Sequence, residues 1–338
     1  MRRHLIPLIL VLTLIAAILP ASAIAHPGKT DANGGHTCRT NCGQWGLKDG
    51  EYHYHNKDGS IRKTGDKNTA QKGAGTAMIL PKKQAAGTLQ VYFLDVGQGD
   101  STLIRTPNNQ YILIDAGDND KGEDVVTYLK HLGVNQLDAV IATHPDADHI
   151  GGLDDVINAF PVKAVYAPKV SHTTQTFKDF LLAVKKQKLT IKTAKASVDI
   201  PLAGVKAKFV GPVNEYGNEL NEWSAVLRLQ YKDTSFLFTG DAELKSEADM
   251  LKSGAALSAD VLKVGHHGST TSTSQKFLNA VKPAHAVISA GKGNKYGHPT
   301  KDILTRLQKA KAKIYRTDQQ GTVTAISDGK KITFATAR

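Results

Sequence analysis

Cysteine is scarce in this sequence. Only Cys38 and Cys42 occur among 338 residues, and both precede the region that carries regular apolar patterns. A large region without cysteine is compatible with any redox compartment, so the cysteine content assigns none. The sequence also offers no convincing serine or cysteine triad. This leaves metal-activated water as the candidate nucleophile.

Long apolar runs are missing apart from the N-terminus. Residues 5–19 are almost entirely apolar, but this run is shorter than the roughly 20 residues that span a bilayer. Two arginines precede it, and small-x-small cleavage sites end at Ala23 and Ala25. We therefore predict a secretory signal peptide over residues 1–25, a secreted or cell-surface location, and no integral membrane domain. An uncleaved anchor is the alternative.

Acidic residues are outnumbered, since 43 Lys and Arg stand against 31 Asp and Glu, a net charge of +12. Such a surplus favours acidic partners, namely nucleic acid, an anionic cell-wall polymer or an anionic membrane surface. A lysine-rich surface that serves only solubility is the alternative, and no arginine-rich run decides between them. Composition leaves the oligomeric state open.

Residues 26–60 form a small module that is rich in histidine and poor in apolar side chains. A segment of this size needs a staple to hold one structure. A disulfide and a metal site both fit the residues, and a flexible polar tail is a third possibility. Residues 61–87, dominated by Lys, Gly, Ala, Thr and Gln, predict a flexible linker. The candidate metal ligands of the module are His36, Cys38, Cys42, His53 and His55.

Residues 88–338 alternate predicted strands and helices, in an order that fits an α+β, four-layer αββα sandwich. Helices are expected over residues 123–132, around 177–184, between 270 and 283, and after Pro299, because apolar side chains recur there at helical spacing. Strands are expected at residues 89–96, 101–105, 110–115, 139–142, 162–166, 205–210, 224–231, 235–238, 260–264, 284–289, 313–316, 322–325 and 331–334.

The stretch 143–152 concentrates candidate metal ligands. It follows residues 139–142, an apolar run that predicts a buried strand. A mixture of imidazole and carboxylate side chains occupies it, and such a mixture suits a divalent metal. A polar turn with stray histidines is the alternative. The four candidate ligands are His144, Asp146, Asp148 and His149.

Two later strands end in the same manner. Residues 235–238 precede Asp241, and residues 260–264 precede His266 and His267. Loops at strand ends meet at one edge of a sheet, where α/β proteins place their ligands. The sequence therefore predicts that these side chains join the stretch 143–152 in one site for two metal ions, Zn²⁺ or Mn²⁺.

The stretch 143–152 resembles the His-x-His-x-Asp-His signature of metallo-β-lactamase-fold hydrolases, with Asp146 in place of the second histidine. This variant, together with the pattern from Asn221 to Ser224, looks like the hydrolase domain of ComEC-type DNA-uptake proteins. The resemblance covers residues 88–338 and implies the metallo-β-lactamase fold.

Other features of the chain also resemble known modules. In the same family, the strand-end loop that here carries Asp95 and Asp100 supports the metal centre from beneath. Residues 52–55, Tyr-His-Tyr-His, resemble the short YHYH domain of secreted bacterial proteins. That second resemblance names a module without implying a function.

The predicted ligands divide between two ions. One ion takes His144 and Asp146, and Asp241 bridges to the other. The second ion takes Asp148, His149 and one of the pair His266 and His267, with His266 slightly preferred. Because no histidine lies between His172 and His266, the first ion has few nitrogen donors, which favours Mn²⁺ relative to a three-histidine zinc site.

The expected activity is metal-dependent hydrolysis, most plausibly of a phosphodiester such as DNA by a metal-bound hydroxide. Asp148 would orient the nucleophile, and His298 would donate to the phosphoryl group or to the leaving oxygen. Hydrolysis of a lactam, lactone or thioester is the enzymatic alternative. A non-catalytic protein that binds cell-surface polyanions is the alternative of another class. The expected phosphate-binding side chains are Asn221, Ser224 and Ser269.

If residues 1–25 are a signal peptide, the mature chain begins at residue 24 or 26 and is found outside the cell. N-terminal sequencing of protein recovered from culture supernatant tests this. Recovery of only the full-length chain, bound to the membrane, would contradict it.

Overall fold

The computed structural model describes residues 35–38, 42–45, 47–48, 50–55, 61–63 and 87–338. The chain divides into two compact units, Met1–Gly73 and Ala74–Arg338, which we describe separately. The predicted signal peptide lies outside the described residues, as does the predicted linker apart from residues 61–63 and 87.

The N-terminal unit contains a small antiparallel sheet of three strands, β1 (Gly35–Thr37), β2 (Tyr52–His55) and β3 (Ile61–Lys63). A 3-10 turn, η1 (Cys42–Trp45), lies between β1 and β2. Cys38 and Cys42 form a disulfide and pack with Leu47. Of the two staples that the sequence allows, this structure contains the disulfide, which removes both thiolates as metal ligands. The third strand lies just beyond the expected end of the module.

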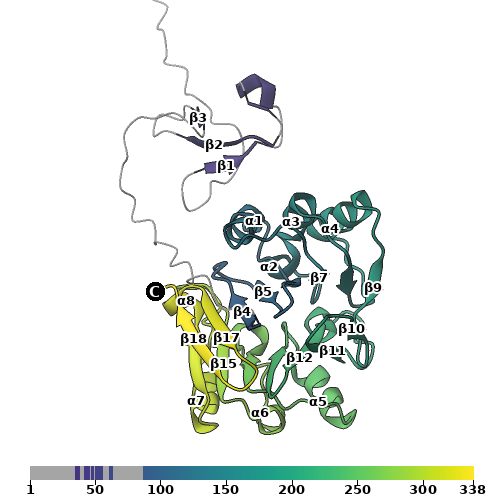
Figure 1. The fold of residues 1–338 in the computed structure, drawn as a ribbon, viewed down its shortest axis with the longest axis vertical. Helices are drawn as coiled ribbons and strands as arrows, with labels where there is room; N and C mark the ends of the chain where they lie inside the picture. The colour runs from purple at the N-terminus through teal and green to yellow at the C-terminus, as the bar shows by residue number, and fades with distance from the viewer. Residues whose placement is uncertain (1–34, 39–41, 46, 49, 56–60, 64–86) are drawn as a thin grey trace, which may run out of the picture. The chain divides into compact units, whose positions relative to one another are not determined.

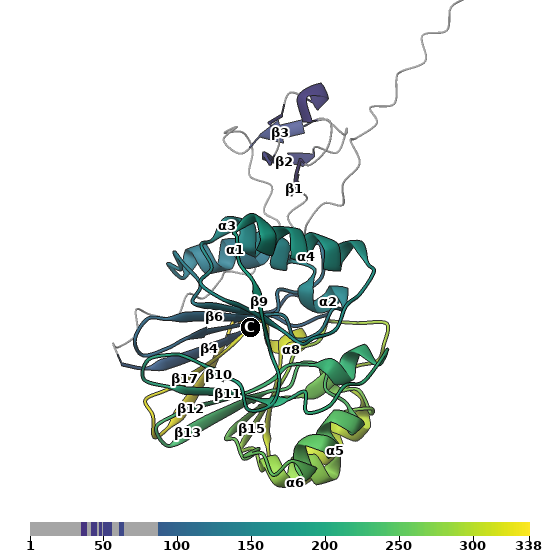
Figure 2. The ribbon, with the colours of Figure 1, turned by 90° about the vertical axis from the view of Figure 1, so that its right-hand side faces the viewer.

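The main domain, residues 87–338, has four layers: helices, a sheet, a second sheet and helices, as Figure 1 and Figure 2 show. This is the αββα sandwich that the sequence predicts, and that prediction is confirmed. One sheet has the order β18-β17-β4-β5-β6-β7-β8-β9, and the other has the order β10-β11-β12-β13-β14-β15-β16.

The strands of the eight-stranded sheet are β4 (Leu89–Phe93), β5 (Thr102–Arg105), β6 (Tyr111–Ile114), β7 (Ala139–Ile141), β8 (Val165–Ala167), β9 (Ile191–Thr193), β17 (Val323–Ser327) and β18 (Ile332–Thr336). Those of the seven-stranded sheet are β10 (Asp199–Ile200), β11 (Lys206–Gly211), β12 (Val226–Tyr231), β13 (Thr234–Phe238), β14 (Val261–Lys263), β15 (His285–Ile288) and β16 (Lys313–Arg316).

The helices and 3-10 turns of the main domain are α1 (Gly122–His131), α2 (Ala147–Ile150), α3 (Leu153–Ala159), α4 (Gln175–Lys186), η2 (Leu220–Trp223), α5 (Leu244–Lys252), η3 (Gly265–Gly268), α6 (Gln275–Val281), α7 (Lys301–Lys309) and α8 (Thr317–Gln320). Helices α1, α3 and α4 cover the outer face of the eight-stranded sheet, and α5, α6 and α7 cover that of the seven-stranded sheet (Figure 2). None of the helices among the described residues combines the length and the apolar character that crossing a bilayer requires.

Strand alternation builds the core between the sheets. In β4, Leu89, Val91 and Phe93 face the opposite sheet, whereas Tyr92 faces the helices. The ring of Phe93 lies 6.1 Å from that of Phe238 across the interface between the sheets. Because successive side chains of a strand point to opposite faces, one apolar strand contributes to two cores.

Several elements with a low apolar content are not predicted from the sequence. Helix α5 has one fully buried large apolar side chain, Met250, beside the buried polar Ser246 and Glu247. The edge strands β9 and β10 are short and largely exposed. The strand expected at residues 162–166 begins later, as β8, because Val162 forms only an isolated bridge with Leu137.

Parallel strands position the functional edge of the sandwich. Strands β6 to β9 run parallel to one another, and so do β13 to β16. The loops after β6, β7, β13, β14 and β15 therefore emerge at one edge, together with the segment that leads into β12, which is antiparallel to β13. Backbone hydrogen bonds join several of these segments. The amide of Ala225 donates to Thr143 at 2.9 Å, and that of His266 donates to Gly240 at 3.2 Å.

A chain that starts at Thr88 should fold by itself, because the three large cores lie within the main domain. We expect cooperative thermal unfolding, with a midpoint within a few degrees of that of the main domain in the whole chain. Calorimetry of both proteins measures this. Non-cooperative unfolding of the truncated chain would show that the main domain needs the N-terminal unit.

Candidate metal centre

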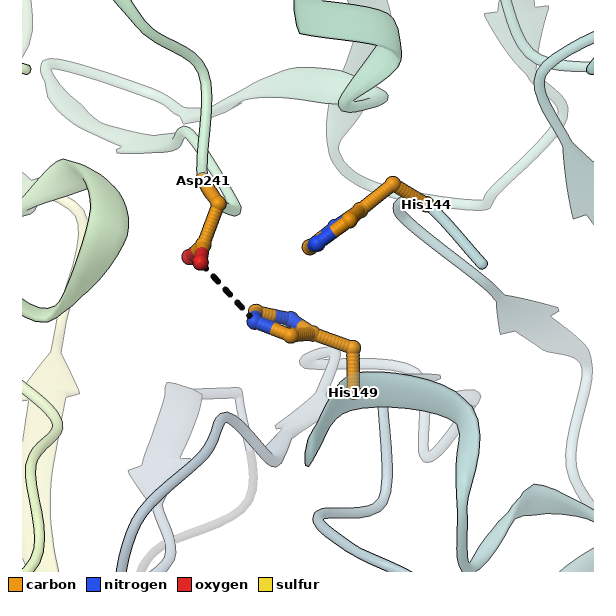
Figure 3. Close-up of side chains that lie close together, drawn as sticks. All are labelled: His144, His149 and Asp241. Carbon is orange, nitrogen blue, oxygen red and sulfur yellow. Dashed lines mark ion pairs between the residues drawn. The ribbon is translucent and has the colours of Figure 1, made fainter. Parts of the chain in front are cut away.

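The centre of the functional edge is a group of two imidazoles and a carboxylate. His144 and His149 follow β7, and Asp241 follows β13. Figure 3 shows the three side chains converging. The Nε2 atom of His149 lies 3.2 Å from Oδ2 of Asp241, and the centroids of the two imidazole rings are 4.2 Å apart. All three side chains are buried, so their polar atoms need partners.

A third imidazole reaches the same carboxylate from the loop after β14. The Nε2 atom of His267 lies 3.3 Å from Oδ2 of Asp241 and 3.3 Å from Oδ2 of Asp148. Asp241 therefore lies between His149 and His267, which is the place of a bridging ligand. The structure thus brings His144, Asp148, His149, Asp241 and His267 together.

The opposite ring nitrogen of each histidine is already engaged. The Nδ1 atom of His149 lies 2.9 Å from Oδ2 of Asp115, and that of His267 lies 3.0 Å from the carbonyl oxygen of Ser289. The Nδ1 atom of His144 lies 3.1 Å from Oγ1 of Thr143. A carboxylate or carbonyl that accepts from Nδ1 leaves the lone pair of the ring on Nε2, which is the arrangement of metal-binding histidines.

Asp115 organises one half of the centre, and the sequence does not identify it as functional. Its Oδ1 accepts the amide of Thr143 at 2.8 Å, and its Oδ2 accepts the hydroxyl of Thr143 at 2.6 Å. The same Oδ2 faces His149. Asp115 is fully buried and has a φ of 56°, a left-handed backbone conformation that aspartate tolerates better than most residues. Its position at the end of a strand and two residues before Gly117 is the signal that could have revealed it.

A buried lysine organises the other half. The Nζ atom of Lys263 lies 2.8 Å from Oδ2 of Asp100, and Oδ1 of Asp100 lies 3.3 Å from Nδ1 of His267. Lys263 and Asp100 are both buried, so they form a buried ion pair behind His267. The sequence predicts the supporting role of Asp100 only by resemblance and does not predict Lys263.

The electrostatics of the group favour positive charge. Burial by itself would raise the pKa of Asp241, but His149 and His267 hold that pKa well below its ordinary value. Burial would lower the pKa of His149, but Asp241 and Asp115 raise it well above the ordinary value. The pKa of His267 is raised in the same way against burial, by Asp241, Asp100 and Asp148. The group therefore keeps its carboxylates ionised and attracts cations to its centre.

A divalent cation fits this group. Among the described residues, Nε2 of His144, His149 and His267 are buried without a hydrogen bond, and so is Oδ1 of Asp241. The Nε2 atoms of His149 and His267 lie within ion-pair distance of Oδ2 of Asp241, but the angles at these contacts are not those of hydrogen bonds. In two overlapping sets, the ligand atoms lie within 4.8 Å of one another. These sets are His144, His149 and Asp241, and Asp148, His149 and His267.

The two adjacent histidines have different positions. Both His266 and His267 have left-handed backbone conformations, with φ of 43° and 53°, and their ring planes differ by 71°. His267 is buried in the centre, whereas Nε2 of His266 lies 3.8 Å from Asp241 and its Nδ1 lies 2.7 Å from Glu243. The geometry therefore favours His267 as the ligand, and not His266, which the sequence slightly preferred. The ring of His266 is turned towards Glu243.

A set of polar side chains around His266, which we call the mouth cluster, borders the centre. Its members are Asn221, Glu243, His266, Ser269, Thr271 and His298. The Nδ2 atom of Asn221 lies 3.4 Å from both Glu243 and Nδ1 of His266, and Ser269 and Thr271 share a hydrogen bond of 2.8 Å. The ring of His298 lies 5.5 Å from that of His266. Burial, followed by the charges of His266 and His267, lowers the pKa of His298, so its ring is neutral near pH 7.

Three predicted site residues have other surroundings. Ser224 is fully buried, and its Oγ accepts the amide of Asp241 at 3.1 Å, so it supports a ligand from behind. Asp146 is partly exposed, with Oδ2 3.4 Å from Nε2 of His144, at the edge of the centre. Asp95 is not in the group, because its carboxylate pairs with Arg338 at 2.7 Å.

Comparison with known proteins gives three similarities. The sequence profile of the Metallo-beta-lactamase superfamily matches residues 94–292. ComE operon protein 3 of Bacillus subtilis (strain 168) is 33% identical over 251 residues, which cover 69% of this chain and 32% of that protein. Competence protein ComA of Neisseria gonorrhoeae is 34% identical over 244 residues, which cover 72% of this chain and 32% of that protein. The chain thus spans about a third of the length of these two relatives.

Similarity to solved structures is found at much lower identity. The metallo-beta-lactamase fold protein YhfI from Bacillus subtilis has a TM-score of 0.47 and 11% identity, over 73% of this chain and 100% of that chain.

Replacing Asp115 with asparagine should weaken metal binding without removing a ligand. If the amide oxygen keeps the backbone N–H of Thr143, the amide NH2 faces Nδ1 of His149 and cannot accept its proton. The ring then loses its orientation, and such changes cost about 10- to 100-fold in metal affinity. Competition titrations of Zn²⁺ and Mn²⁺ against a chromophoric chelator measure the dissociation constants. Asp95→Asn, which alters a carboxylate outside the group, is the control. Equal affinities of the wild type and Asp115→Asn would contradict this role.

Proposed function

Since the chain belongs to the metallo-β-lactamase superfamily, whose members are generally metal-dependent hydrolases, we propose that it is an exported phosphodiesterase that cleaves nucleic acid. The observation that carries the proposal is the set of three buried Nε2 atoms that make no hydrogen bond and lie close to the carboxylates of Asp146, Asp148 and Asp241. Buried polar atoms of this kind require a partner, and a divalent cation supplies it.

Two ions account for the distribution of ligands. His144 and Asp146 would hold one ion, and Asp148, His149 and His267 would hold the other, with Asp241 between them. Because His149 is assigned to the second ion, the first ion has a single imidazole, with Asp146 and Asp241 as its oxygen donors. This ligand set favours Mn²⁺ more than a site with three imidazoles does, and Zn²⁺ remains the competing ion.

The side chains of the centre have distinct tasks in phosphodiester hydrolysis. A bound divalent metal lowers the pKa of water towards neutrality and stabilises the charge on the attacking and leaving oxygens. Asp148, which is part exposed, would orient the attacking water with the carboxylate oxygen that does not face His267. Asn221 and Ser269 in the mouth cluster would donate hydrogen bonds to the phosphoryl oxygens. His298, whose neutral ring still carries one N–H, would donate a hydrogen bond to the leaving oxygen.

Three observations favour a nucleic acid over a lactam, lactone or thioester. One relative is named a competence protein, a term that concerns DNA uptake. The net charge of +12 suits a polyanionic substrate. Tyr296 is 56% exposed, and its ring stacks near that of His298 at 5.9 Å, so an aromatic face for a base lies beside the mouth cluster.

Export is part of the proposal and rests on the N-terminal sequence. The positive start, the short apolar run and the small-residue cleavage sites support a secreted or cell-surface enzyme. DNA outside the cell is then the substrate. An anionic cell-wall phosphodiester is the competing substrate in the same compartment.

Cleavage should require both the metal and Asp148. We expect Asp148→Ala to lower the turnover of bis-p-nitrophenyl phosphate and of single-stranded DNA by several orders of magnitude, because one carboxylate serves as ligand and orienting group. Chelation should abolish turnover, and Mn²⁺ or Zn²⁺ should restore it. Initial rates of product formation measure both effects.

The control variant is Asp95→Ala, which removes a carboxylate that pairs with Arg338 outside the centre. Its turnover should match that of the wild type. If metal-loaded wild type spares every phosphodiester and opens lactams, lactones or thioesters, the proposed activity is wrong. Cleavage that survives both chelation and Asp148→Ala would belong to a contaminant.

A further inference from the structure

A long groove lies on the outer face of the seven-stranded sheet, where the helices do not cover it. Helices α5 to α7 pack on Val210 and Val226, but the continuing parts of β11 and β12 carry polar side chains. A groove of about 730 Å³ runs over β10, β11 and β12 beside residues 253–256, which follow α5. A second hollow of about 320 Å³ adjoins it and shares Val205, Lys206 and Gln230.

Strand register places cations along this groove. Lys208 of β11 is paired with Arg228 of β12, and Lys206 is paired with Gln230. Lys206 and Lys208 are two positions apart on one strand, so their side chains point to the same face, and their Cα atoms are about 7 Å apart. Lys232 follows β12 and lines the adjoining hollow. The groove and the adjoining hollow together therefore have four basic side chains, three of which line the groove.

The charges of the groove are only weakly neutralised. The Lys208–Asp199 pair is 3.4 Å long, and both of its side chains are more than half exposed, so water screens it. Between residues 87 and 338, no ion pair involves Lys206. Arg228 is held in place by Ser258 and Gln230, at 3.0 Å and 3.1 Å, through two of its nitrogens. Asp199 is the one acidic residue that lines the groove.

The segment that leads into the groove is strongly basic. Residues 185–208 contain seven lysines and one acidic residue, Asp199. All seven lysines are exposed. This segment supplies one edge strand of each sheet, β9 of the eight-stranded sheet and β10 of the seven-stranded sheet. The net charge of this segment is +6, whereas residues 87–338, with 31 Lys and Arg and 26 Asp and Glu, have a net charge of +5. The basic surplus of the main domain is thus concentrated in this segment, and the groove is the concave part of its surface.

The groove also has an apolar floor. Leu202, Val205, Val213 and Ala255 are among the residues that line it. A ligand that matches this surface needs a repeating negative charge together with flat apolar groups. Single-stranded DNA has both, whereas a duplex conceals its bases and an acidic peptide lacks them.

We propose that this groove is a docking site for single-stranded DNA, separate from the metal centre. The proposal rests on the nuclease function proposed above and adds a second point of contact for the same substrate. Ser224 lies behind Asp241 in the metal centre, and Gln230 lines the groove six positions further along the chain. Six steps of an extended strand correspond to about 20 Å. A short substrate therefore reaches only the metal centre, and a long strand reaches both.

The test compares two double variants of the full-length chain with equal charge. Lys206→Glu/Lys208→Glu alters the groove. Lys130→Glu/Lys276→Glu alters exposed lysines of α1 and α6, outside the groove. Each substitution changes the charge by two, so both double variants go from +12 to +8. Binding of fluorescein-labelled dT20 is followed by anisotropy in the presence of a chelator, so that cleavage does not interfere.

The groove variant should bind dT20 about tenfold more weakly than the wild type at low salt. The slope of log K against log salt should fall by about 1.4, since each lost phosphate contact contributes about 0.7 for single strands. The control variant should stay within about twofold of the wild type. Equal weakening of both variants would overturn the proposal, because net charge alone would then explain binding. Displacement of dT20 by poly-glutamate at equal charge concentration would also overturn it, in favour of an acidic protein partner.

Turnover of bis-p-nitrophenyl phosphate by the metal-loaded proteins separates this inference from the proposed function. Both double variants should turn over this small substrate at the rate of the wild type. If the wild type has no such turnover but the binding pattern appears as expected, the nuclease function fails and the groove remains a docking site. If turnover is present and the groove variant binds dT20 as the wild type does, the docking site is wrong.

Discussion

The buried carboxylate of Asp115 is the contact on which the candidate metal centre depends. It accepts the backbone and the hydroxyl of Thr143 and faces Nδ1 of His149, so it joins the end of β6 to the loop that carries most of the ligands. A buried charge that loses its partners typically costs 3–5 kcal/mol. The left-handed backbone of Asp115 is tolerated because these contacts hold the side chain in one place.

The two sheets each supply half of the centre. The eight-stranded sheet brings Asp115 and the loop with His144 and His149, and the seven-stranded sheet brings Asp241 and His267. Close backbone approach is needed where the halves meet. A Cβ at Gly240, after β13, would press on Thr143 at 3.0 Å, and one at Gly291, after β15, would lie 2.7 Å from the backbone nitrogen of Gln98. The centre therefore forms only when the sandwich closes.

Negative and positive side chains gather in different parts of the main domain. Carboxylates gather at the functional edge, where a divalent cation would balance them, whereas lysines gather in residues 185–208 and beside the groove. A polyanion would be attracted by the basic surface and repelled by the bare carboxylates until a cation neutralises them. The metal centre and the basic surface thus suit one another only when the metal is bound.

Local sequence determined much of the fold and of the candidate metal centre. Apolar alternation and turns mark most strands of residues 88–338, and the apolar run before residue 143 places four ligand-type side chains at a strand end. Strand-end placement also singles out Asp241 and the pair His266 and His267, because position along a strand is a local property. The layered fold follows from the order of these elements.

Only the tertiary structure decided the rest. The choice between His266 and His267 depends on two left-handed residues and on where Glu243 lies, which no local pattern encodes. Asp115 and Lys263 look like ordinary ends of strands in the sequence, and their roles arise from partners 28 and 163 positions away, Thr143 and Asp100. The weakly apolar helix α5 and the short edge strands β9 and β10 form because neighbouring elements hold them in place. Long-range contacts select among the options that local sequence leaves open, since burial and charge pairing exist only after the sheets have met.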